Sequence, residues 1–172
     1  MIQIFINFIA TLSAVALGFM LSLWHDRRKK ARERNLAKLK VMESIKAELE
    51  LNLQHLGEKG DPNHIVILRF VTVSKDSSVG SGDFMLLDLE LQKVLSRIYN
   101  NFETAQMWTD KILSLAGTIN MALLRDADRN IREFWGMAFA IHEALRRDIP
   151  KALEELGRRI SGLRSELSVE SL

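Results

Sequence analysis

The chain has 172 residues, a formal net charge of +2 and no cysteine. This length suits one domain plus an appendage, and the lack of cysteine excludes disulfides, thiolate metal ligands and cysteine nucleophiles. The positive charge is concentrated, because residues 25–40 carry a net +6 and the rest of the chain therefore carries −4. A single basic patch on an otherwise acidic chain argues against a broad nucleic-acid-binding surface.

The first segment, residues 1–24, contains no ionisable side chain. As a helix rising about 1.5 Å per residue it would reach roughly 35 Å, enough to cross a hydrocarbon core of about 30 Å. A secretory signal peptide would have its cations before the apolar stretch and a small-residue cleavage site after it. Here the cations follow the stretch, so we expect residues 1–25 to form a retained transmembrane helix.

The cations behind this segment predict its orientation. The positive-inside rule places the N-terminus outside and the C-terminal domain in the cytoplasm, at an inner or plasma membrane. Cations close to anionic headgroups each add about 1 kcal/mol of attraction. No aromatic residues alternate with these cations, which argues against nucleic-acid binding. We call them the collar: Arg27, Arg28, Lys29, Lys30, Arg32 and Arg34.

One face of the predicted span is small or polar, and the opposite face is bulky. At about 100° per residue the small and polar positions fall within a sector of about 100°. Asn and Thr in hydrocarbon seek partners on another helix, and small residues four apart let two backbones approach. We call this face the stripe: Gln3, Asn7, Thr11, Ala14, Gly18, Ser22 and His25.

The stripe allows three functions. The span could associate with copies of itself and present a cytoplasmic helical interaction domain, which is the hypothesis we favour. It could instead form a homo-oligomeric ion channel, with Asn7, Thr11 and Ser22 lining the pore and His25 at its cytoplasmic mouth. It could also dock on a larger membrane protein as an accessory subunit.

Residues 26–56 continue the helical pattern, with apolar residues at three- and four-residue spacings. A continuous helix over residues 3–56 would be about 80 Å long. Asn52 lies close to the apolar seam and is either a hydrogen-bonded core residue or one that fixes register and oligomeric state. Residues 64–83 combine β-branched side chains with no second strand to pair with. We expect a short helix or irregular packed segment there, followed by a flexible loop at residues 75–82.

Three more helices are predicted, at about residues 86–116, 118–148 and 150–167. Pro150 is expected to begin the last one, a position at which its missing N–H does no harm. The heptad spacing of residues 149–167 is expected to serve packing inside a bundle. The fold class is therefore all-α, with the transmembrane helix continuing into an antiparallel cytoplasmic helical bundle over residues 26–172.

No catalytic, cofactor-binding or metal-binding pattern is present in the sequence. The histidines lack metal-ligand spacing, and the serines lie in no nucleophile motif. His142 falls on the apolar face of the helix predicted at residues 118–148 and is expected to be a hydrogen-bonded core residue. Glu48 and Glu50 are interpreted as solvated charges. We expect a protein that is not an enzyme and has no cofactor, whose partners are the bilayer and either itself or another membrane protein.

Three segments resemble a group of uncharacterised prokaryotic single-span membrane proteins. They are IKAELELNL at 45–53, SGDFMLL at 81–87 and LSRIYNNF at 95–102. The resemblance extends over roughly the first 105 residues and leaves out the last two predicted helices. It implies a membrane-tethered helical domain of unknown function and supplies no active-site residues.

Overall fold

The computed structural model describes residues 2–57, 68–117 and 124–169, with side chains described for residues 11–57, 68–115 and 129–169. These ranges contain four α-helices, one 3-10 helix and no strand, which confirms the predicted all-α fold. The elements in chain order are α1 (Ile2–Leu56), α2 (Val73–Ser81), η1 (Asp83–Leu86), α3 (Leu89–Gly117) and α4 (Leu124–Val169).

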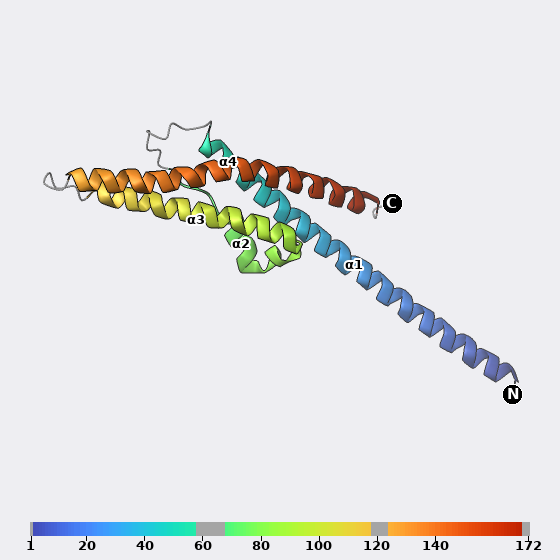
Figure 1. The fold of residues 1–172 in the computed structure, drawn as a ribbon. Coiled ribbons are helices and arrows are strands. Elements are labelled where there is room, and N and C mark those ends of the chain that lie inside the picture. The colour runs from blue at the N-terminus through green and yellow to red at the C-terminus, as the bar shows by residue number, and fades with distance from the viewer. Residues whose placement is uncertain (1, 58–67, 118–123, 170–172) are drawn as a thin grey trace.

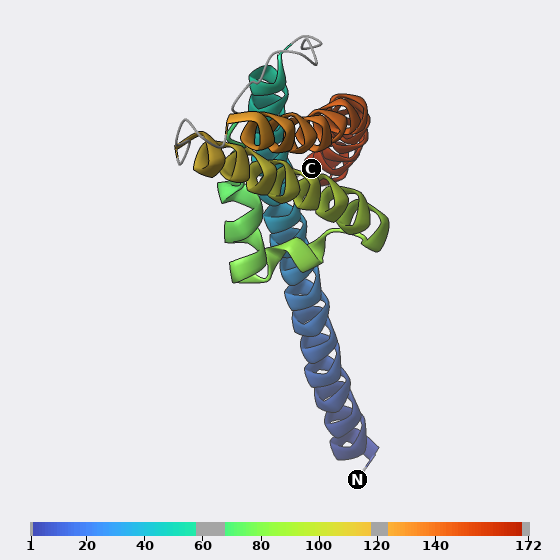
Figure 2. The same ribbon diagram turned by 60° about the vertical axis from the view of Figure 1, so that its left-hand side comes forward.

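The helices form an antiparallel bundle with one projecting rod (Figure 1). α3 and α4 lie side by side over most of their length, and α4 runs antiparallel to both α1 and α3. The C-terminal half of α1 packs against α4, while α2 and η1 pack beside α1. The N-terminal half of α1 extends away from every other helix, as the turned view in Figure 2 also shows.

The core lies where α1, α3 and α4 meet. Its largest fully buried side chains come from all three helices, because each presents apolar residues at three- and four-residue spacings on one face. Phe70, in the non-helical segment 68–72 before α2, and Phe84 in η1 complete this cluster. The buried apolar residues of α1 are Val41, Met42, Ile45, Leu49 and Leu56.

Polar contacts hold the helix ends in place. Asp88 caps α3 by accepting a hydrogen bond from the Leu91 N–H at 3.1 Å. Arg146 of α4 donates to the carbonyl of Leu56, the last residue of α1, at 2.7 Å. A cation at this end also opposes the partial negative charge of the helix C-terminus.

Two predicted element boundaries are wrong. The helices expected at 118–148 and 150–167 are one continuous helix over their described residues, because α4 runs through Pro150 without a break. Residues 118–123 lie outside the described ranges. The flexible loop expected at residues 75–82 is mostly helical, because α2 spans Val73–Ser81 and ends at Gly82. Residues 64–67 of the uncertain segment lie outside the described ranges.

The heptad seam predicted for residues 149–167 packs inside the bundle as far as Leu163. Ile149, Leu156 and Ile160 are buried, and Leu153 and Leu163 pack against the same core. Over the residues described, no helix is long and apolar enough to cross a membrane.

Candidate functional site

The stripe lies on the projecting half of α1. Its described members, from Thr11 to His25, are all exposed on this single chain. The side chains of Gln3 and Asn7 lie outside the described part. The bulky side of the same segment is equally uncovered, with Leu12 and Phe19 more than 60% exposed.

The collar is exposed along its whole length as well. The Arg28 guanidinium lies 5.5 Å from the centre of the Trp24 ring, so cation and ring stack at the point where the charged segment begins. Together with Lys29 and Arg32, His25 and Arg28 line a shallow groove on this stretch of α1. Three collar residues, Arg28, Lys29 and Arg32, therefore share one surface with the last residue of the stripe.

The stripe and the core-facing side of α1 point in opposite directions. At about 100° per residue, the sector that holds the stripe is about 180° from the sector that holds the buried residues between Val41 and Leu56. Residues on the stripe side within the bundle, such as Leu36, Ala47 and Gln54, are exposed. The helices that pack on α1 thus leave the stripe side of the rod open.

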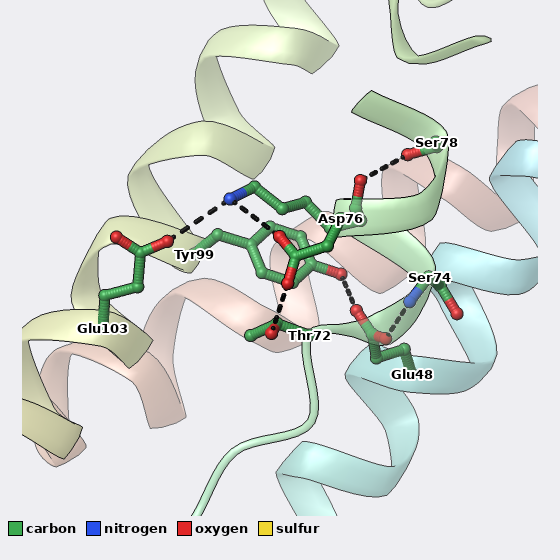
Figure 3. Close-up of polar contacts among 8 residues, drawn as sticks. Glu48, Thr72, Ser74, Asp76, Ser78, Tyr99 and Glu103 are labelled. Carbon is green, nitrogen blue, oxygen red and sulfur yellow. Dashed lines mark hydrogen bonds and ion pairs between the residues drawn. The ribbon is translucent and has the colours of Figure 1, made fainter. Parts of the chain in front are cut away.

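A second cluster lies inside the bundle, where α1 meets α2 and α3 (Figure 3). Glu48 of α1 is 5% exposed. One of its carboxylate oxygens accepts a hydrogen bond from the Tyr99 hydroxyl at 2.5 Å. The other accepts one from the backbone N–H of Ser74, in the first turn of α2, at 2.6 Å. We call Glu48, Asn52, Ser74 and Tyr99 the polar junction.

Asn52, one helical turn after Glu48, holds the chain just before α2. Its side-chain amide donates to the Val71 carbonyl at 2.7 Å and accepts from the Val71 N–H at 2.8 Å. This paired contact copies the hydrogen bonding of a neighbouring strand, so the backbone N–H and carbonyl of Val71 have partners without a sheet. The prediction of a hydrogen-bonded core asparagine is confirmed, whereas the interpretation of Glu48 as a solvated charge is wrong.

Charges on α2 and α3 surround the junction. Lys75 lies 3.3 Å from both Asp76 and Glu103, and its ammonium is 5.7 Å from the centre of the Tyr99 ring. Burial, together with the hydrogen bond to Glu48, raises the pKa of the Tyr99 hydroxyl well above its usual range. Tyr99 therefore stays protonated as a donor to the carboxylate.

The junction is built to hold elements together. Both oxygens of Glu48 accept hydrogen bonds from the protein itself, and the side chain is buried between the elements that it joins. Within the described ranges, no three His, Asp or Glu side chains come together as a metal site. Two members of the polar junction, Glu48 and Asn52, lie in the IKAELELNL segment, and Tyr99 lies in LSRIYNNF.

His142 lies in the core, where the sequence predicted it. It is 2% exposed in the core, but its Nε2 atom has no hydrogen-bond partner among the described residues. Desolvation first, and then the nearby charge of Arg146, lower the pKa of His142 to about 4. The predicted position in the core is confirmed, and the structure adds that the Nε2 atom has no partner among the described residues.

Comparison with known proteins identifies no relative of this chain: no family model, no curated protein and no solved structure matches it.

Proposed function

We propose that the chain is a single-pass membrane protein that associates with copies of itself through the stripe. In this proposal residues 1–25 span an inner or plasma membrane with the N-terminus outside. The helical bundle then stands on the cytoplasmic side as an interaction domain, and the collar lies at the level of the anionic headgroups. The observation that carries the proposal is the position of the stripe on an uncovered helix face, opposite the face that holds the bundle.

The proposed span is supported by the uncharged stretch of residues 1–24, of which the structure describes side chains from Thr11 onward. From Thr11 to Trp24 these side chains contact no other element and include apolar groups such as Leu17 and Met20, both more than 60% exposed. An apolar helix surface of this kind calls for lipid or a partner. The change at His25 from uncharged to cationic residues fits a membrane boundary.

Self-association is supported by the geometry of α1. Small side chains at Ala14, Gly18 and Ser22 would let two helices approach closely. A Cβ atom added at Gly18 would meet nothing within 4 Å in the single chain, so the space beside it is open to a second helix. Because the bundle packs on the opposite side, copies joined at the stripe would carry their bundles outward.

The test is the oligomeric state of the full chain in detergent, measured by light scattering with the detergent mass subtracted. We expect a defined oligomer for the natural sequence. Ala14→Leu should shift it toward monomer, because the larger side chain holds the two backbones apart. Ala16→Leu makes the same chemical change on the bulky side of the helix and should leave the oligomer intact.

Two other results would replace the proposal. A natural chain that stays monomeric from low to high protein-to-detergent ratio would exclude self-association. A second membrane protein that co-purifies at fixed stoichiometry, and is lost with Ala14→Leu, would identify the chain as an accessory subunit. Conductance in reconstituted bilayers would show that the oligomer also forms an ion-conducting pore.

Membrane orientation has a separate test, which is clean because the chain has no cysteine. Ser77→Cys places one exposed thiol on the bundle, and Gln3→Cys places one at the opposite end of α1. A membrane-impermeant maleimide added to intact cells should label the second variant and spare the first. The reverse pattern would overturn the proposed topology, and labelling of both would exclude a span.

A further inference from the structure

His142 lies at a contact between α4 and the non-helical segment 68–72. Its ring packs against Phe70 at a centroid distance of 5.9 Å and against Trp135 at 5.8 Å, both at steep interplanar angles. Phe70 in turn stacks on Phe102 of α3 at 4.5 Å. The imidazole therefore occupies an aromatic enclosure in which its Nε2 has no partner among the residues described.

The charged groups that act on His142 both belong to its own helix. Arg146, one turn along, carries a positive charge and donates to the end of α1, while Glu143 forms an ion pair with Arg146. The rings that enclose His142 from the 68–72 segment and from α4 are uncharged, and no charged group of α1 or α3 has an effect on it in the described structure. A second cation would thus be placed beside Arg146 with no new counter-charge.

We propose that His142 is an acid-sensitive latch: when its imidazole is protonated, the segment 68–72 detaches from α4 while the α1–α3–α4 core stays folded. Neutral imidazole fits the aromatic enclosure, and imidazolium requires water. The nearest route to water is displacement of Phe70, because that ring belongs to a non-helical segment rather than to a packed helix. Phe70 lies next to Val71, which Asn52 holds, so its release would also loosen the start of α2 from α1.

The sign of the pH effect follows from the lowered pKa. An exposed histidine titrates near pH 6.5, whereas the enclosed form of His142 titrates near 4. Opening is therefore unaffected above about pH 6.5 and becomes more favourable as the pH falls from there toward 4. At pH 5, linkage predicts that the open state gains about twentyfold relative to its population at pH 7.

Hydrogen–deuterium exchange of the natural full chain in detergent micelles tests the latch directly. After correction for intrinsic exchange rates, amides of residues 68–72 should lose about twentyfold in protection between pH 7 and pH 5. Amides of residues 95–102 in α3 should keep theirs. Equal loss in both segments would mean acid unfolding of the whole bundle and would overturn the proposal, as would unchanged protection of residues 68–72.

A fluorescence titration assigns the effect to His142. Trp24→Phe and Trp108→Phe leave Trp135, which touches His142, as the only tryptophan. Its emission should change with a midpoint between pH 4 and pH 6.5. Adding His142→Phe should abolish the change, whereas His55→Gln, which alters an exposed histidine at the end of α1, should preserve it. A transition that survives His142→Phe would exclude the latch, and if that variant fails to fold the exchange experiment decides alone.

Discussion

Glu48 illustrates how one buried carboxylate can join three helices. Tyr99 reaches it from α3 and the Ser74 N–H from α2, so loss of Glu48 would leave one buried and one partly buried donor without an acceptor. The sequence could not identify this role, because Glu48 and Glu50 look alike in an alternating charged stretch. What separates them is the contact with Tyr99, which lies 51 positions away in the chain.

Replacement of Glu48 should therefore be costly. Each unsatisfied buried donor costs about 1–3 kcal/mol, so we expect Glu48→Ala to lower the free energy of unfolding by about 3 kcal/mol. Glu50→Ala, at a side chain that is 51% exposed, should change it by less than about 0.5 kcal/mol. Chemical denaturation of the full chain in detergent, followed by circular dichroism, measures both. Similar losses for the two variants would contradict the buried role of Glu48.

Tyr99 is the only tyrosine of the chain, so its ionisation can be observed without interference. Its pKa is raised in the folded protein, and an unfolded tyrosine ionises near pH 10. The stabilising effect is therefore complete below about pH 10 and decreases as the pH rises further, because only the unfolded state releases the proton.

Absorbance at the tyrosinate band should accordingly stay flat through pH 10 and rise only together with the loss of helical circular dichroism. Tyr99→Phe should remove this alkaline component of the stability profile. Tyrosinate that appears near pH 10 in a fully helical protein would show that the hydroxyl is not held by Glu48.

At the scale of whole elements, α2 shows where sequence patterns mislead. Its sequence, VSKDSSVGS, is rich in serine and contains a glycine, a composition typical of loops. The helix forms because tertiary contacts support it: Glu48 accepts from its first turn, and Ser78 is buried. Gly82, the feature that does end the helix, is visible in the sequence and adopts φ +80° in the structure.

Two glycines two positions apart provide a matched test of this helix end. A Cβ atom added at either Gly80 or Gly82 meets nothing within 4 Å, so sterics with neighbours are equal. Gly82→Ala must place a side chain in the left-handed region and should destabilise by about 1–2 kcal/mol. Gly80→Ala, inside the helix, should stabilise by about 0.5–1 kcal/mol. Thermal unfolding of the full chain compares them, and shifts of the same sign would contradict the assigned cap.

Pro150 shows the opposite case, in which tertiary packing overrides a residue that normally breaks a helix. A proline inside a helix costs about 3 kcal/mol, which predicted a break at this position. However, the buried residues Leu145, Ile149 and Leu156 continue on one face across it, and each contributes about 1.5–3 kcal/mol. The proline itself is exposed, so its ring stays out of the core. The apolar periodicity could be read from the sequence. The sequence did not show that packing of this apolar face outweighs the cost of the proline.

At the scale of the whole molecule, α1 is one continuous helix that connects the proposed span to the bundle. Its continuity was predictable, since no glycine or proline occurs between Gly18 and Gly57. The angular relation between the stripe and the bundle was not, because it depends on which face of α1 packs against α4, α2 and η1. The structure fixes that relation: residues 26–34 are helical and exposed, so only the helix itself transmits it.

Changing the length of this connection should therefore control self-association without altering either end. Two alanines inserted after Ala31 rotate the bundle by about 200° relative to the stripe, and seven rotate it by about 700°, which falls only about 20° short of two full turns. In the proposed oligomer the first insertion turns the bundles inward, where they collide, and should weaken association at least tenfold. The seven-residue insertion lengthens α1 more than the two-residue insertion does, but it keeps the bundles pointing outward and should retain the oligomer. Light scattering or sedimentation of the full chains in detergent compares the two.

Equal association of the two variants would mean that the bundle's direction does not constrain the contact at the stripe. Loss of the oligomer in both variants would mean that the distance between bundle and membrane matters more than the angle between bundle and stripe.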